Sequence, residues 1–208
     1  LLLLFHRRWR FAAATGAAAV LLAATYTPPA PLPDAPDAPR VRIVQPNIGQ
    51  ASQFVPGHDE RMVRSLIALS GTPGAAPRLV VWPEGAVNYF LEDGYPREYY
   101  FQAHPGRTRA RVASVLGARD MLLLGGSALL FDPARRLTGA ANSIFVIGPD
   151  GLIHGRYDKT HLVPYGEYLP AREWLEPLGL SRLVMGDIDY LPGPGPQSLS
   201  VPGFGRIA

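Results

Sequence analysis

Three charged residues could form one acid–base site in this chain: Glu84, Lys159 and Glu167. Lys159 is the only lysine, against nineteen arginines. A lysine ammonium is a compact point charge, whereas a guanidinium is a wide planar fork. A site that needs one small donor against a developing oxyanion therefore favours lysine. The alternative interpretation is that one lysine persists by chance in an arginine-rich sequence.

The two glutamates stand where catalytic side chains often lie. Glu84 follows an apolar stretch in VVWPEG, so we expect it at the carboxyl edge of a buried strand, a suitable place for a general base. Glu167 lies eight residues after Lys159, in the sequence VPYGEY. The proline and glycine there predict a loop, and loops carry many catalytic residues. An ordinary loop residue and an exposed salt bridge are the respective alternatives.

His161 is a further candidate because histidine is the usual acid–base group near neutral pH. The chain has neither a GxSxG sequence nor a cysteine to act as its partner, so we expect His161 to be structural. The absence of cysteine also excludes disulfides and thiolate metal sites within these residues. A base, an oxyanion donor and a second carboxylate are predicted, but the 208 residues contain no convincing nucleophile.

Composition predicts one sizeable core with a smaller element attached. The chain has 208 residues, of which 47% are hydrophobic and 18% charged. The net charge of +3 comes from arginines that are scattered singly, except in the clusters at residues 6–10 and 107–111. No basic stripe alternates with aromatics, which argues against nucleic-acid binding. We interpret the cluster at 107–111 as a solvated helix face.

Short apolar stretches alternate with amphipathic ones from residue 40 onward, which predicts an α/β protein with a mixed sheet. The sequence GPDG at residues 148–151 has the turn chemistry of a hairpin. The expected strands are residues 41–45, 79–82, 121–125, 142–147, 152–157 and a last one beginning at 204, and the expected helices are residues 58–70, 107–118 and 171–178.

The first 39 residues predict a membrane segment and a linker. Residues 11–27 are apolar and end in tyrosine and threonine, which suggests a transmembrane helix whose preceding arginines stay in the cytoplasm. Residues 1–5 would then be the tail of a preceding span and 6–10 a cytoplasmic loop. Residues 28–39 are a proline-rich linker to a domain at 40–208. A cleavable signal peptide and a buried alanine-rich helix are the alternatives.

Four segments resemble the bacterial apolipoprotein N-acyltransferases, integral membrane enzymes whose extracytoplasmic domain belongs to the nitrilase superfamily. They are VRIVQPNIGQ (41–50), LVVWPEG (79–85), NSIFVIGPDG (142–151) and YDKTHLVPYGEYLP (157–170). The sequence WPE occurs in much of the superfamily. The block K-x-H-L-V-P-[FY]-G-E-[FY] is close to diagnostic of the acyltransferases.

The resemblance implies a nitrilase-like α-β-β-α sandwich, here truncated, preceded by one transmembrane helix. It implies Glu84 as general base, Lys159 as oxyanion stabiliser and Glu167 as a second essential carboxylate. It also implies a two-step reaction in which a cysteine thiolate takes an acyl chain from a phospholipid and passes it to the α-amine of diacylglyceryl-cysteine on an apolipoprotein. No metal or organic cofactor is implied. The protein would lie in the bacterial inner membrane with its catalytic domain on the periplasmic side.

The sequence departs from the family's pattern at two places. The nucleophilic cysteine of the family should lie just after a strand like residues 205–208, where this sequence stops. We therefore expect the chain to be a fragment that is inactive by itself. The family also tends to have Lys-Trp in the loop after its first strand, where this chain has Gln53 and Phe54, so details of lipid contact there are open.

Two other functions are compatible with these residues. A soluble amidase of the same superfamily would use the same chemistry with water as acceptor. The apolar helix and the proline linker argue against it. A non-catalytic nitrilase-like module that binds lipid or lipoprotein is the alternative from another class, because the 208 residues lack the cysteine.

Overall fold

The computed structural model of the protein describes residues 2–26, 28, 38–49, 55–100, 103–170, 174 and 189–207. The chain divides into two compact units, Leu1–Pro36 and Asp37–Ala208. The expected linker at 28–39 and the expected helix at 171–178 lie almost entirely outside the described residues.

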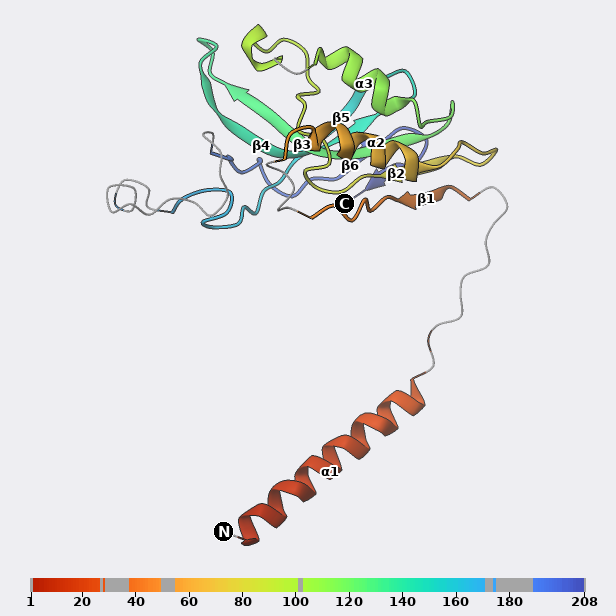
Figure 1. Cartoon of the computed structure of the whole chain (residues 1–208), viewed down its shortest axis with the longest axis vertical. Helices are drawn as coiled ribbons and strands as arrows, with labels where there is room; N and C mark the ends of the chain where they lie inside the picture. The colour runs from red at the N-terminus through yellow and green to blue at the C-terminus, as the bar shows by residue number, and fades with distance from the viewer. Residues whose placement is uncertain are drawn as a thin grey trace. The chain divides into compact units, whose positions relative to one another are not determined.

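The first unit contains one helix, α1 (Leu2–Thr25), drawn in red in Figure 1. It continues through residues 6–10, where we expected a loop between two segments. These five residues contain no glycine or proline, and arginine is a good helix former, so nothing in the sequence interrupts the backbone hydrogen bonds.

No helix in the described part of the chain combines the length and apolar character that a bilayer crossing requires. The predicted transmembrane helix at 11–27 is therefore not confirmed.

The second unit is built around a five-stranded sheet with the strand order β1-β2-β3-β4-β5. Strand β2 pairs in parallel with both β1 and β3, whereas β4 pairs antiparallel with both β3 and β5. Helix α2 joins β1 to β2, and α3 joins β2 to β3 (Figure 1). The elements are β1 (Arg40–Ile43), α2 (His58–Ser70), β2 (Arg78–Val81), the 3-10 helix η2 (Arg97–Tyr100), α3 (Pro105–Ala113), β3 (Met121–Phe131), β4 (Leu137–Ile147), β5 (Ile153–Asp158), β6 (Leu199–Val201) and β7 (Gly205–Ile207).

The two faces of the sheet bury different residues because strand side chains alternate between faces. Val80, Leu122 and Phe145 pack in one cluster with residues of α2 and α3. Their neighbours Leu79 and Val146 pack in a second cluster with Val201 of β6 and Ile207 of β7. Strands β6 and β7 pair with each other and form a separate two-stranded sheet. We call these the helix face and the β6–β7 face. The described residues thus form a helix layer and two sheet layers, and the predicted mixed α/β fold is confirmed.

Some elements differ from the predicted ones. Strands β3 and β4 each contain eleven residues and form a second, longer hairpin that we did not predict. Strand β6 was also not predicted. The interpretation of residues 107–111 as a solvated face is wrong for Arg109, which is buried and donates hydrogen bonds to the carbonyls of Leu91 and Gly151.

Candidate active site

Lys159 lies between the carboxylates of Glu84 and Glu167. Its Nζ is 3.2 Å from Oε1 of Glu84 and 3.1 Å from Oε2 of Glu167. Side-chain exposure is 65% for Glu84, 31% for Lys159 and 13% for Glu167. One carboxylate is therefore open to an incoming molecule, while the other is largely enclosed.

Asn142 of β4 joins both carboxylates. Its side-chain amide donates hydrogen bonds to Oε1 of Glu84 and, at 2.8 Å, to Oε1 of Glu167. Its backbone carbonyl accepts a hydrogen bond of 2.8 Å from the Lys159 amide. Sequence reasoning missed this residue, although the block NSIFVIGPDG begins with it. We call Glu84, Asn142, Lys159 and Glu167 the charged cluster.

Glu84 reaches the cluster because the chain turns sharply after β2. Gly85, the next residue, has a φ of 62°, a left-handed conformation that glycine adopts without steric cost. Gly125 of β3 has no side chain, which lets Pro83 and Glu84 pass close above it. The Ala86 amide donates a 3.1 Å hydrogen bond to the Gly125 carbonyl and fixes the crossing.

Glu167 is held by a compact turn that follows β5. Its Oε2 accepts a hydrogen bond of 2.8 Å from the Val163 amide, and its own amide donates one of 2.9 Å to the Val163 carbonyl. Tyr165, at the tip of the turn, has a φ of 62°, which is rare for a residue other than glycine. The turn brings Glu167 back to Lys159, the first residue after β5.

Hydrogen bonds within the cluster favour the charged forms of Glu167 and Lys159. Burial by itself would raise the pKa of Glu167, but hydrogen bonds from Asn142, the Val163 amide and Lys159 outweigh it and lower the pKa. Burial would likewise lower the pKa of Lys159, yet its hydrogen bonds to Glu167 and Glu84 raise it above the ordinary value. Lys159 is thus a permanently charged donor at neutral pH rather than a base.

Two cavities meet at the cluster. A cleft of about 470 Å³ is lined by polar residues that include Glu84, Asn142 and Glu167. A smaller cavity of about 200 Å³, lined mainly by apolar groups, also touches Glu84 and Asn142 and includes Lys159. A polar and an apolar group of one substrate could therefore both approach Glu84 and Lys159.

The other predicted candidate, His161, is exposed, and no hydrogen bond joins it to the three charged residues. Among the residues that the structure describes, no group of three or more histidine, aspartate or glutamate side chains could hold a metal ion.

The mixed α/β fold agrees with the comparison with known families. The chain belongs to the carbon-nitrogen hydrolase family, whose pattern it matches over residues 40–199.

Several curated relatives carry one name, apolipoprotein N-acyltransferase. The protein of that name from Rhodopseudomonas palustris is 32% identical over 174 residues, which make up 80% of this chain and 30% of the relative. The one from Rhizobium meliloti is 36% identical over 159 residues, 74% of this chain and 28% of the relative. The chain thus spans about 30% of the length of the curated relatives it matches.

Among solved structures, the C. elegans NitFhit protein is similar with a TM-score of 0.29 and 12% identity. The match covers 81% of this chain and 35% of that one.

Proposed function

We propose that residues 40–208 supply the acid–base and oxyanion-stabilising groups of an apolipoprotein N-acyltransferase. Glu84 is the general base, Lys159 the oxyanion donor and Glu167 the carboxylate that fixes the lysine. The observation that carries the proposal is the position of Lys159 Nζ, 3.2 Å from Glu84 and 3.1 Å from Glu167. The names of the relatives support the reaction class.

In the first step Glu84 takes the proton of a cysteine thiol, because a thiol is only slightly ionised at neutral pH. The sulfur attacks the ester carbonyl carbon of a phospholipid, and the carbonyl oxygen becomes an oxyanion that Lys159 stabilises. The ester C–O bond then breaks. The lysophospholipid leaves with the proton from Glu84, and an acyl thioester remains.

In the second step the α-amine of a diacylglyceryl-cysteine attacks the thioester carbonyl. Lys159 again stabilises the oxyanion, and Glu84 accepts the proton that the attacking nitrogen loses. The C–S bond breaks, the amide forms, and the thiolate recovers the proton from Glu84. The side chain of Glu84 is 65% exposed, which suits a base that must take a proton first from the thiol and then from the amine.

The thiol is not among these residues, since the chain has no cysteine. In our proposal it follows β7 closely in the complete gene product. Ile207 of β7 lines a cavity together with Leu123 and Tyr157. The same two residues line the small cavity of Glu84 and Lys159, which supports this position.

The proposal includes the setting of the reaction. The acyl donor is a membrane phospholipid and the acceptor an apolipoprotein. The complete protein would therefore be a multi-pass protein of the bacterial inner membrane, with this domain on the periplasmic side. The reaction needs neither a metal nor an organic cofactor.

The test uses the complete gene product in phospholipid vesicles with a synthetic diacylglyceryl-cysteine peptide, and mass spectrometry measures the added acyl chain. We expect Glu84→Gln to lower the turnover by about 10²- to 10⁴-fold, the usual contribution of a general base. Lys159→Arg should lower it by about 10²- to 10³-fold, because the wide guanidinium misplaces the donor. Glu98→Gln, at an exposed glutamate, is the matched control and should retain wild-type turnover.

Each alternative function has its own outcome. Release of free acid from an amide without acyl transfer would identify a soluble-type amidase. Binding of the lipopeptide without any turnover would identify a binding module. Wild-type transfer by the Lys159→Arg variant would remove the catalytic assignment of that residue.

A further inference from the structure

A second polar network lies behind the charged cluster, on the other face of β4 and β5. Ser143 pairs with Asp158 across the two strands and shares the helix face with Phe145. Asn142, which precedes Ser143, and Lys159, which follows Asp158, point to the opposite face because strand side chains alternate. The two networks are therefore separated only by the backbones of β4 and β5.

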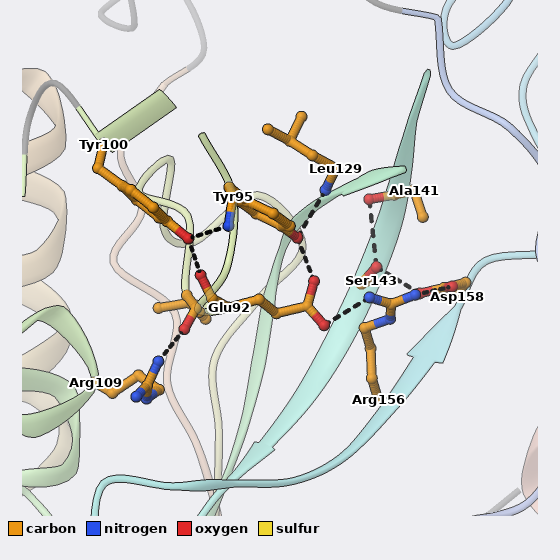
Figure 2. Close-up of polar contacts among 10 residues, drawn as sticks. Glu92, Tyr95, Tyr100, Arg109, Leu129, Ala141, Ser143, Arg156 and Asp158 are labelled. Carbon is orange, nitrogen blue, oxygen red and sulfur yellow. Dashed lines mark hydrogen bonds and ion pairs between the residues drawn. The ribbon is translucent and has the colours of Figure 1, made fainter. Parts of the chain in front are cut away.

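The second network is a continuous chain of hydrogen bonds and ion pairs (Figure 2). Ser143 Oγ donates to Asp158 Oδ1 at 2.7 Å, and Asp158 Oδ2 accepts from Arg156 Nη2 at 2.9 Å. The other guanidinium nitrogen, Nη1, lies 2.7 Å from Glu92 Oε1. The second oxygen of Glu92 accepts a hydrogen bond from the Tyr95 hydroxyl. We call these five residues the rear network.

The rear network connects β4 and β5 to the segment that follows Glu84. Glu92 and Tyr95 belong to that segment, and the Tyr95 hydroxyl accepts a 3.0 Å hydrogen bond from the Leu129 amide of β3. The Tyr100 hydroxyl donates to the Glu92 carbonyl at 2.6 Å, which adds a second attachment within the segment (Figure 2). The rear network thus connects strands β3, β4 and β5 to the segment that follows Glu84.

The network is partly enclosed, so its interactions are stronger than those of surface pairs. Side-chain exposure is 25% for Glu92, 27% for Arg156 and 15% for Asp158, and Ser143 is buried. Burial would lower the pKa of Arg156, but the two carboxylates outweigh it and raise the pKa. Burial and the hydrogen bond to Glu92 raise the pKa of Tyr95. Arg156 therefore stays charged and Tyr95 stays neutral at neutral pH.

We propose that the rear network positions Lys159: Glu92, Arg156, Asp158 and Ser143 hold β4 and β5 so that the ammonium lies between Glu84 and Glu167. These four are positioning residues, because their side chains face away from the charged cluster. Their effect reaches the cluster through the backbone, since Asp158 adjoins Lys159 and Ser143 adjoins Asn142. The consequence for catalysis rests on the proposed function, whereas the position of the lysine does not.

The first readout is the reactivity of Lys159 toward acetic anhydride in the complete gene product. Only the uncharged amine reacts, so the ion pairs to Glu84 and Glu167 slow the reaction. Mass spectrometry follows the peptide that contains Lys159, which is the only lysine among residues 1–208. We expect Arg156→Gln to raise the labelling rate by about 3- to 10-fold, because the ammonium would lose part of its contact with the two carboxylates.

The matched control is Arg136→Gln, which breaks the exposed ion pair with Asp132 at the end of the β3–β4 hairpin. It should leave the labelling rate unchanged. Far-UV circular dichroism verifies that both variants are folded. Should Arg156→Gln fail to fold, Ser143→Ala and Tyr95→Phe each remove one hydroxyl and should raise the rate in the same direction by a smaller factor.

The second readout is acyl transfer. A positioning role predicts that Arg156→Gln lowers kcat with little change in KM, and that Arg156→Lys restores part of kcat. Lys159 labelling equal to that of the Arg136→Gln control in all folded variants would overturn the proposal. A labelling response in a protein that transfers no acyl chain would keep the positioning role and refute the proposed function instead.

Discussion

Gly125 of β3 lies so close to Glu84 that a Cβ atom on the glycine would come 2.8 Å from the Cα of Glu84. The neighbouring atoms are backbone, which cannot rotate away. The strand and the segment after β2 can cross here only because position 125 has no side chain.

Gly125→Ala should therefore displace Glu84 and destabilise the domain by about 1–3 kcal/mol, the usual cost of an added methyl group in a packed region. Thermal unfolding followed by circular dichroism measures the stability, and acyl transfer by the complete gene product measures the displacement. Gly74→Ala, where a Cβ would meet no atom within 4 Å, is the control. Equal melting temperatures for the two variants would contradict the predicted clash.

Asn142 is expected to matter for turnover although it transfers no proton. Asn142→Ala removes the donor that joins Glu84 to Glu167, so the two carboxylates lose their common anchor beside Lys159. A hydrogen bond to a charged group contributes about 1.5–3 kcal/mol, which corresponds to a loss of about 10- to 100-fold in kcat. Steady-state kinetics of the complete gene product measures this loss. A kcat within a factor of about two of wild type would show that the carboxylates need no such anchor.

Glu60 of α2 gives the domain a pH-dependent stability. Hydrogen bonds from Arg111 and Arg64 lower the pKa of Glu60 from its ordinary 4.5 to about 2. Because this pKa is lowered in the folded state, Glu60 stabilises the fold at pH values above its ordinary pKa of 4.5. The contribution disappears as the pH falls from 4.5 toward 2.

Urea unfolding at several pH values tests this contribution. Because Glu60 is 42% exposed, solvent screens the pairs, and Glu60→Gln should cost less than about 1 kcal/mol at neutral pH. The difference from wild type should shrink steadily below pH 4.5. Glu98→Gln serves as the control, and a difference that stays constant down to about pH 3 would exclude the linkage.

The sequence predicted individual elements well where local signals are strong. Helix α2 has the predicted bounds, residues 58–70, because its apolar residues recur at helical spacing between two glycines. The turn at 148–151 is also local, and its Gly151 has the positive φ that Asp-Gly suggests.

Relationships across long stretches of chain could not be predicted in this way. Asn142 lies within a strand, so its link to Glu84 across 58 residues depends on how β2 and β4 are placed in the sheet. The burial of Arg109 depends on partners distant in sequence, the carbonyls of Leu91 and Gly151 and the carboxylate of Asp93, which no local pattern reveals. Residue types and expected loops grouped Glu84 with Lys159 as candidates, and the resemblance to a family then implied their roles.

The alternation along β4 and β5 makes the site sensitive to length changes rather than to most substitutions. Deleting one residue near the middle of either strand would exchange the faces of Asn142 and Ser143, or of Lys159 and Asp158. A lysine would then point toward the apolar helices and an aspartate toward the two glutamates. Single-residue insertions and deletions in these strands should therefore be rejected far more often than point mutations during the divergence of this protein.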